Sequence, residues 1–151
     1  MNAQMIWVWM LVGIASGALF AAQGPVNARL APAIGGPLMA SLVSFIVGAA
    51  ILFAINAFTL PQLPSATQAA GVPWWAWIGG SFGVAVVTLT VIAVPKIGVA
   101  AWVSALIAGQ LAASVLYDHY GAFGQAVREV NWQKLIGVAL LLAGAWFVRR
   151  F

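Results

Sequence analysis

The sequence predicts an all-α membrane protein with five transmembrane helices, forming a single domain over residues 1–151. Of its 151 residues, 64% are hydrophobic and 5% are charged, whereas soluble domains are about 45–50% apolar and about 25% charged. The mean hydropathy is +1.06. This composition excludes a soluble globular domain, and it excludes a disordered chain, which needs low hydrophobicity and high charge. One bilayer crossing takes about 20 apolar residues, so five crossings use about 100 residues and leave about 50 for connections.

Glycine and proline mark the ends of the first two spans. The first span is expected over residues 5–24, ending at Gly24 and Pro25, because proline interrupts helical hydrogen bonding. The second span is expected over residues 37–60, and Pro61 closes it. No charged side chain interrupts either stretch.

Prolines and charged residues bound the last three spans. These spans are expected over residues 74–94, 98–117 and 132–147. Lys134 and Arg149 lie near the ends of the fifth span, where their long side chains can reach the lipid headgroups. The fifth span is the shortest, and a re-entrant segment is the alternative interpretation for it.

The basic residues indicate how the chain is oriented. Five spans place the two termini on opposite sides of the membrane. The N-terminal side then carries 2 basic residues, Arg128 and Lys134. The other side carries 4, which are Arg29, Lys96, Arg149 and Arg150. The positive-inside rule favours a cytoplasmic C-terminus. Because the difference is small, the sequence also permits dual topology, in which some chains insert each way.

Polar residues inside a membrane are costly and usually functional. The richest run surrounds the expected break in the first span, where Gln23, Asn27 and Arg29 lie within two turns. Broken helices that line cavities are where transporters place solute contacts. These residues are therefore candidate solute-binding residues, with Arg29 attracting an anionic group at the entrance. The alternative is a capped helix end with Arg29 among the headgroups.

The second span adds Ser41, Ser44 and Phe45 about one turn from its start. Ser41 and Phe45 are four residues apart and share one helix face. Hydroxyls there would bind a solute, and the ring would supply a flat apolar wall. The alternative for Ser41 is a hydrogen bond to its own backbone four residues earlier.

The fourth span carries a polar stripe. Gln110, Ser114 and Asp118 are spaced by four residues, which places them on one helix face. A mid-span amide is not expected to face lipid, so the stripe lines a cavity or bonds to a neighbouring helix. Gln110 and Ser114 are therefore candidate solute contacts. Asp118 ends the stripe and is the candidate for proton coupling, with a solvated acid at a helix end as the alternative.

Tryptophans gather near the expected span ends, as amphipathic rings do at headgroup level. Trp77 and Trp102 lie about one turn deeper than this belt. They are candidate walls of a solute cavity, and membership of the interfacial belt is the alternative.

Several kinds of chemistry have no residues to carry them. The chain has no cysteine, one histidine and two acids, so we expect no metal site and no cofactor. It has no zinc-protease, nucleophile-elbow or P-loop motif, so we do not expect an enzyme. Its basic residues are scattered or sit at span ends, so nucleic acid is not an expected partner. The expected partners are the lipid bilayer, a small-molecule solute and a second copy of the chain.

Five helices are too few to enclose a solute and to open alternately to both sides. Transporters commonly use two inverted repeats around a midplane site, and this chain is too short to hold two five-helix repeats. An antiparallel homodimer would supply the missing repeat. Small residues such as Gly13 and Gly17 would let the helices pack closely.

Short motifs in four of the spans resemble one known family. Those of the first two spans are Gly17, Gln23, Asn27, Leu30, Gly36–Pro37, Ala40–Ser41, Ser44–Phe45 and Gly48. Those of the third and fourth are Pro73–Trp74–Trp75, Trp77, Gly79–Gly80, Gly83, Gly109–Gln110, Asp118 and Gly121. In this order and spacing, over about residues 5–148, they resemble the YdcZ-like inner-membrane proteins, a five-span branch of the drug/metabolite transporter superfamily.

The resemblance implies a bacterial inner-membrane transporter of small solutes. The family also occurs as adjacent pairs and fused ten-span forms, which favours an antiparallel homodimer. We therefore expect a secondary transporter that moves a small polar, zwitterionic or aromatic metabolite or drug by alternating access. A small channel or pore, and a membrane partner protein that transports nothing, are the alternatives.

Overall fold

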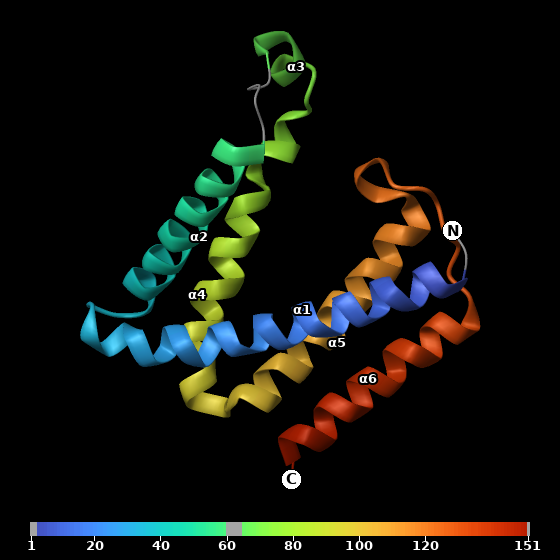
Figure 1. The fold of residues 1–151 in the computed structure, drawn as a ribbon. Helices are drawn as coiled ribbons and strands as arrows, with labels where there is room; N and C mark the ends of the chain where they lie inside the picture. Colours follow the sequence, from blue (N-terminus) through green and yellow to red (C-terminus); the bar gives the residue numbers. More distant parts are fainter. Residues whose placement is uncertain (1–2, 60–64, 151) are drawn as a thin grey trace. The chain divides into compact units, whose positions relative to one another are not determined.

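The computed structural model describes residues 3–59 and 65–150, and every regular element among them is helical. Within these described residues, five helices are long and apolar enough to cross a membrane, which confirms the predicted all-α architecture. They are α1 (Ala3–Leu30), α2 (Pro37–Thr59), α4 (Gly79–Ile97), α5 (Val99–Tyr120) and α6 (Trp132–Arg150) (Figure 1). Four short elements join them: η1 (Ala31–Ala33), α3 (Ala66–Ala70), η2 (Trp74–Ile78) and η3 (Ala122–Gly124). The expected end of the second span, at Leu60 and Pro61, lies outside the described residues.

The predicted helix break at Gly24 and Pro25 is wrong, because α1 continues through Pro25 to Leu30. Proline removes one N–H, and so leaves one backbone carbonyl of the preceding turn without its helical donor. The helix end, which leaves up to four carbonyls without helical partners, then falls at Leu30, next to the exposed Arg29. In lipid, where water cannot satisfy these groups, continuing the helix is the smaller cost. Pro95 lies inside α4 in the same way.

The turn between α1 and α2 is made by the glycines that follow η1. Gly35 and Gly36 have φ angles of +98° and +112°, a region that side chains with a Cβ rarely adopt. The N–H of Gly36 donates to the carbonyl of Ala31 at 2.8 Å. This turn brings the start of α2 back against the end of α1.

The chain divides into two compact units, Met1–Pro95 and Lys96–Phe151, here called the N-terminal unit and the C-terminal unit. Among the described residues, the N-terminal unit contains α1, α2 and most of α4. The C-terminal unit contains α5 and α6, which pack against each other. The single domain expected from the sequence stays a prediction.

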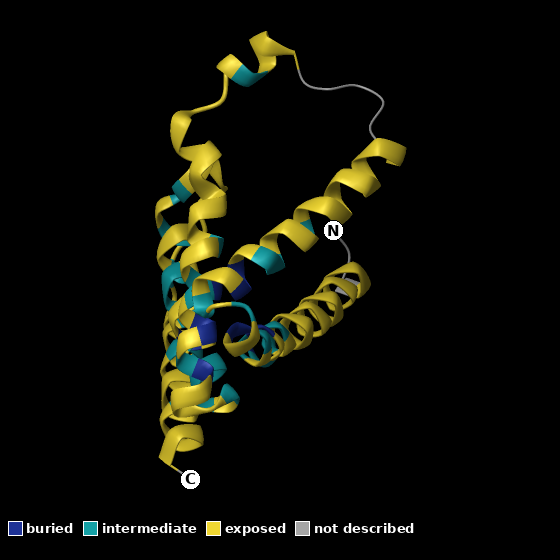
Figure 2. Cartoon of the chain, turned by 90° about the vertical axis from the view of Figure 1, so that its left-hand side faces the viewer, coloured by how far each residue is buried: buried dark blue, intermediate teal, exposed yellow. Residues whose placement is uncertain are grey.

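The core of the N-terminal unit is built from small side chains. Ala31, Ala40 and Val91 form its buried cluster, with Ala28 and Ile34 packed against it. Figure 2 shows how few positions are buried compared with the exposed surface of the helices. A surface of this kind suits lipid or a partner protein, because lipid tails are as apolar as leucine.

Among the glycines of α1, α2 and α4, Gly24 is the one where an added side chain would meet a neighbouring helix most closely. A Cβ atom added there would be 2.6 Å from Cγ2 of Thr90 on α4. At Gly13 and Gly17, the pair expected to mediate packing, an added Cβ would meet nothing within 4 Å. Within the described chain, the close contact of α1 therefore depends on Gly24, which the sequence had marked only as a helix end.

The loop between α5 and α6 is folded around one backbone carbonyl. The carbonyl of Asp118 accepts hydrogen bonds from the N–H of Arg128 at 2.8 Å and of Gly121 at 3.4 Å. Gly121 caps α5 in the left-handed conformation, with φ of 60°. Lys134 Nζ donates to the carbonyls of Arg128 and Glu129 at 3.2 and 3.1 Å. The polar loop is thus held by its own backbone at the end of the hairpin.

Candidate functional site

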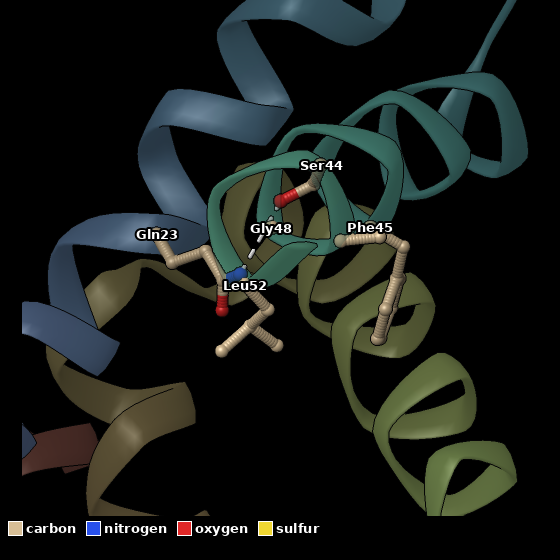
Figure 3. A pocket seen from close by; sticks show the side chains of 6 residues that line it. Gln23, Ser44, Phe45, Gly48 and Leu52 are labelled. Atoms are coloured by element: carbon tan, nitrogen blue, oxygen red, sulfur yellow. Dashed lines mark hydrogen bonds between the residues drawn. The ribbon is translucent and has the colours of Figure 1, made fainter. Parts of the chain in front are cut away.

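Two polar side chains predicted from separate spans meet between α1 and α2. Gln23 Nε2 donates a hydrogen bond to Ser44 Oγ at 3.3 Å, and both side chains are partly buried (Figure 3). An amide and a hydroxyl inside a membrane need polar partners, and here each supplies one to the other. The pair links the two helices at the place where the sequence predicted solute contacts.

The Gln23–Ser44 pair borders a small hollow of about 320 Å³. Its walls are formed by Gln23, Ser44, Phe45, Gly48, Ala49 and Leu52. None of these side chains carries a charge. Small-molecule pockets usually measure about 300–1,000 Å³ and combine apolar walls with a few polar groups. The hollow therefore has the composition of a small ligand site and the volume of the lower end of that range.

Phe45 forms one edge of the hollow and is supported by α4. Its side chain is 37% exposed, and a Cβ added at Gly83 would be 3.2 Å from Cζ of the ring. The ring lies this close to α4 because residue 83 has no side chain. At Gly79, four residues before Gly83, an added Cβ has nothing within 4 Å.

Ser41 joins α2 to α4 and lies apart from the hollow. Its hydroxyl donates to the carbonyl of Pro37 at 3.0 Å and accepts a hydrogen bond from Thr88 Oγ1 at 3.1 Å. The residue is only 3% exposed. The backbone bond is the alternative that its sequence position suggested, and the bond from Thr88 adds a link between the helices.

Asn27 lies one turn beyond Gln23. Its side chain is buried, with the residue only 5% exposed, and the amide nitrogen Nδ2 has no hydrogen-bond acceptor among the described residues. Leaving a buried donor unsatisfied costs about 1–3 kcal/mol. Arg29, two residues further on, is exposed.

The remaining candidate residues lie elsewhere on the chain. Trp77 is on η2 and is 63% exposed. Trp102, Gln110, Ser114 and Asp118 belong to α5, in the C-terminal unit. Gln110 and Ser114 are exposed, and Trp102 and Asp118 are half-buried. Because α5 is helical throughout, Gln110, Ser114 and Asp118 share one face of it, and Ser114 Oγ donates to the carbonyl of Leu111 at 2.9 Å.

Within the described residues, no three histidine, cysteine or acidic side chains gather closely enough to hold a metal ion. A second hollow lies at the end of α6 and is formed by Trp146, Arg149 and Arg150. The Arg150 guanidinium lies 5.4 Å from the centre of the Trp146 ring. Cationic and aromatic groups at the end of a span are typical of headgroup anchors.

Comparison with known proteins identifies the family. The family model described as "Putative inner membrane exporter, YdcZ" matches residues 8–147. The chain belongs to the YdcZ family. The matched region includes both helices that form the Gln23–Ser44 hollow.

One curated relative of this YdcZ-family chain is "Inner membrane protein YdcZ" of Escherichia coli (strain K12). The two are 26% identical over 137 residues, which cover 91% of each chain. No solved structure matches the chain significantly.

Sequence reasoning found part of the hollow in this YdcZ-family protein. Gln23, Ser44 and Phe45 were predicted, and Gly48, Ala49 and Leu52 were missed as lining residues. The missing signal was the helical spacing of α2, because Gly48 and Leu52 lie four and eight residues after Ser44, and Ala49 lies four residues after Phe45. Small residues on that face leave the space that the larger side chains surround.

Proposed function

We propose that the protein is a multi-pass exporter of the bacterial inner membrane and that the Gln23–Ser44 hollow holds its solute. The observation that carries the proposal is an uncharged hollow with one amide and one hydroxyl, built on two membrane-spanning helices. The family description and the name of the Escherichia coli relative support the inner membrane and export. Membership of the drug/metabolite transporter superfamily is part of the same proposal.

The chemistry of the hollow favours a small neutral, zwitterionic or aromatic solute. Gln23 and Ser44 offer hydrogen bonds, and Phe45 offers a flat apolar surface. No carboxylate lines the hollow to offset a bare cation.

We propose alternating access in an antiparallel homodimer, with the C-terminus of one copy cytoplasmic. Five helices in one chain supply half of the inverted pair that such transporters commonly use. The apolar stretch of α1 before Gly24 and that of α6 have no buried residue in the single chain, so both helices have surface available for a partner copy. The small difference in basic residues between the two sides is compatible with both insertions.

The other predicted residues keep their proposed roles. Gln110 is exposed on a spanning helix and makes no hydrogen bond within the described residues, so its amide needs a polar neighbour that a solute path or second copy would supply. Asn27, Ser114, Trp77 and Trp102 are proposed as further solute contacts. Arg29 is proposed at the entrance.

Asp118 is proposed as the proton-coupling residue. It is half-buried at the end of the polar stripe on α5. Loss of coupling in Asp118→Asn, with solute exchange retained, is the expected result.

The hollow can be filled without disturbing the helix that forms it. A Cβ added at Gly48 meets nothing within 4 Å, so the side chain of Gly48→Leu would occupy the hollow. Gly80→Leu is the control, because an added Cβ at Gly80 also meets nothing within 4 Å and Gly80 does not line the hollow. The assay is counterflow in proteoliposomes loaded with unlabelled nicotinamide or L-phenylalanine and supplied with the labelled compound outside.

We expect wild-type protein and Gly80→Leu to show saturable counterflow of at least one compound, and Gly48→Leu to lose it. Counterflow requires a carrier, so linear flux without counterflow would favour the channel alternative. Full counterflow by Gly48→Leu would remove the hollow from the pathway. Absence of counterflow for both compounds in folded wild-type protein would contradict the proposed solute class.

A further inference from the structure

We propose that the hollow recognises a planar, uncharged ring with an amide-type edge, in which a C=O and an N–H lie side by side. Benzamide, nicotinamide and ring lactams have this edge. The inference rests on the proposed function and specifies the solute class of the same site.

The Gln23–Ser44 pair leaves hydrogen-bonding capacity unused. Gln23 Nε2 donates to Ser44 Oγ, so the carbonyl oxygen of Gln23 still accepts, and the hydroxyl hydrogen of Ser44 still donates. Neither group makes another hydrogen bond within the described residues. Figure 3 shows the Gln23 oxygen turned away from Ser44.

The arrangement of these two groups limits which ligands can bind to both. One acceptor from α1 and one donor from α2 stand next to each other, joined by the Gln23–Ser44 bond. A ligand that satisfies both must present a donor and an acceptor on neighbouring atoms. An amide edge does so, whereas a ketone lacks the donor and an amidinium lacks the acceptor.

The rest of the hollow is apolar. Phe45 and Leu52 supply its large apolar side chains, and Gly48 and Ala49 leave the space between them. Phe45 is 37% exposed, and its Cζ and Cε1 lie beside Gly83 of α4, so a flat ring in the hollow can contact the part of Phe45 that lines it. The volume of about 320 Å³ favours a molecule of one or two rings.

The charged residues of the N-terminal unit also restrict the ligand. Arg29 is the one charged side chain in the sequence of the N-terminal unit, and it does not line the hollow. A cationic ligand would therefore enter an apolar site without a counter-charge, which is strongly disfavoured.

The test compares three compounds of nearly the same shape: benzamide, acetophenone and benzamidinium. Benzamide carries a donor and an acceptor, acetophenone only the acceptor, and benzamidinium only donors and a positive charge. Their dissociation constants are measured with the full-length protein in detergent, by equilibrium dialysis and by the shift in thermal unfolding. We expect benzamide to bind about tenfold more tightly than acetophenone, because one hydrogen bond is lost, and benzamidinium to bind most weakly.

Two variants connect the preference to the pair. In Gln23→Leu the acceptor is gone, so benzamide and acetophenone should bind about equally. Ser44→Ala removes the donor that the carbonyls of both ligands use, so it should weaken benzamide and acetophenone alike and keep the preference for benzamide. Gln23→Met, which also lacks the acceptor, replaces Gln23→Leu if the latter does not fold. Gly80→Leu should keep the wild-type preference.

Equal binding of benzamide and acetophenone to the wild-type protein would overturn the inference, as would tightest binding of benzamidinium. Failure of benzamide to bind, together with counterflow of L-phenylalanine that Gly48→Leu abolishes, would overturn the inference and leave the proposed function standing. Counterflow that survives in Gly48→Leu would instead overturn the proposed function itself.

Discussion

Single glycines decide how closely the helices of the N-terminal unit approach each other. Gly24 brings α1 against Thr90 of α4, and Gly83 lets the Phe45 ring rest on α4. Neither glycine needs an unusual φ angle, so the absent side chain is what matters at each. In a membrane such contacts provide much of the association between helices, because burial of apolar surface from water contributes little.

Gly24→Ala is expected to destabilise the N-terminal unit by about 1–3 kcal/mol, the usual cost of overpacking. The added Cβ would be 2.6 Å from Thr90 Cγ2 and 3.4 Å from Val94 Cγ2, so the Thr90 side chain or the two helices must shift. Unfolding in mixed detergent micelles measures the change. Gly17→Ala is the control on the same helix, and it should be neutral or slightly stabilising because alanine favours helix. Equal effects of the two substitutions would contradict the close approach at Gly24.

Gly83→Ala tests how Phe45 is positioned. The new methyl would lie 3.2 Å from Cζ of the ring, so the ring must move by a few tenths of an ångström. We expect benzamide to bind about fivefold more weakly, the effect of about 1 kcal/mol. Gly79→Ala, where an added Cβ meets nothing within 4 Å, should leave the affinity unchanged. An unchanged affinity in Gly83→Ala would mean that the ring is not part of the binding surface.

At the scale of elements, the number and type of the long helices followed from apolar runs, and their ends did not follow as well. Pro25 indicated a helix end and lies inside α1. Proline preferences are known chiefly from water, where a broken helix can be solvated. In lipid an end is more costly than one missing hydrogen bond.

The site shows the same division between what sequence reveals and what it does not. Gln23 and Ser44 were visible as polar residues in apolar spans, and they meet at 3.3 Å. Their partnership, 21 residues apart in the sequence, depends on the turn at Gly35 and Gly36. Leu52 could not stand out by its residue type, because apolar residues are common everywhere in this chain.

The loop between α5 and α6 allows a prediction in the C-terminal unit. In Gly121→Ala, alanine would have to adopt the left-handed conformation of Gly121. Its Cβ would also lie 2.9 Å from Val127 Cγ2 and 3.0 Å from the carbonyl oxygen of Gln125. We expect a loss of about 2–4 kcal/mol in the free energy of unfolding, from strain and from the clash together.

Gly124→Ala is the control for strain without a clash, because its φ is +77° and nothing lies within 4 Å of an added Cβ. It should cost about 1–2 kcal/mol. If thermal unfolding shows Gly124→Ala to be the more damaging of the two, the described packing of this loop is wrong.

At the scale of the whole molecule, the insertion of the chain rests on few charges. The predicted sides carry 2 and 4 basic residues, and Arg128→Gln would change this to 1 and 4. We expect wild-type chains to insert in both orientations and Arg128→Gln to favour a cytoplasmic C-terminus.

Orientation can be read by labelling single cysteines from outside intact cells, because the natural chain has none. Pro32→Cys and Gln125→Cys mark the two sides, and both residues are exposed. Partial labelling of both is expected in the wild-type background, and Arg128→Gln should lower labelling at residue 32 and raise it at residue 125. Complete labelling of one position, with none of the other, would exclude the antiparallel homodimer.

The central claim, that the Gln23–Ser44 hollow is a solute site open to each side in turn, is tested most directly by Gly48→Cys. The single thiol would lie in the hollow of an otherwise cysteine-free chain. We predict that a water-soluble methanethiosulfonate reacts with it from either side of oriented proteoliposomes, and that nicotinamide slows the reaction. Gly17→Cys should show no such protection. A thiol at residue 48 that does not react from either side, or that reacts at the same rate with and without nicotinamide, would contradict the account.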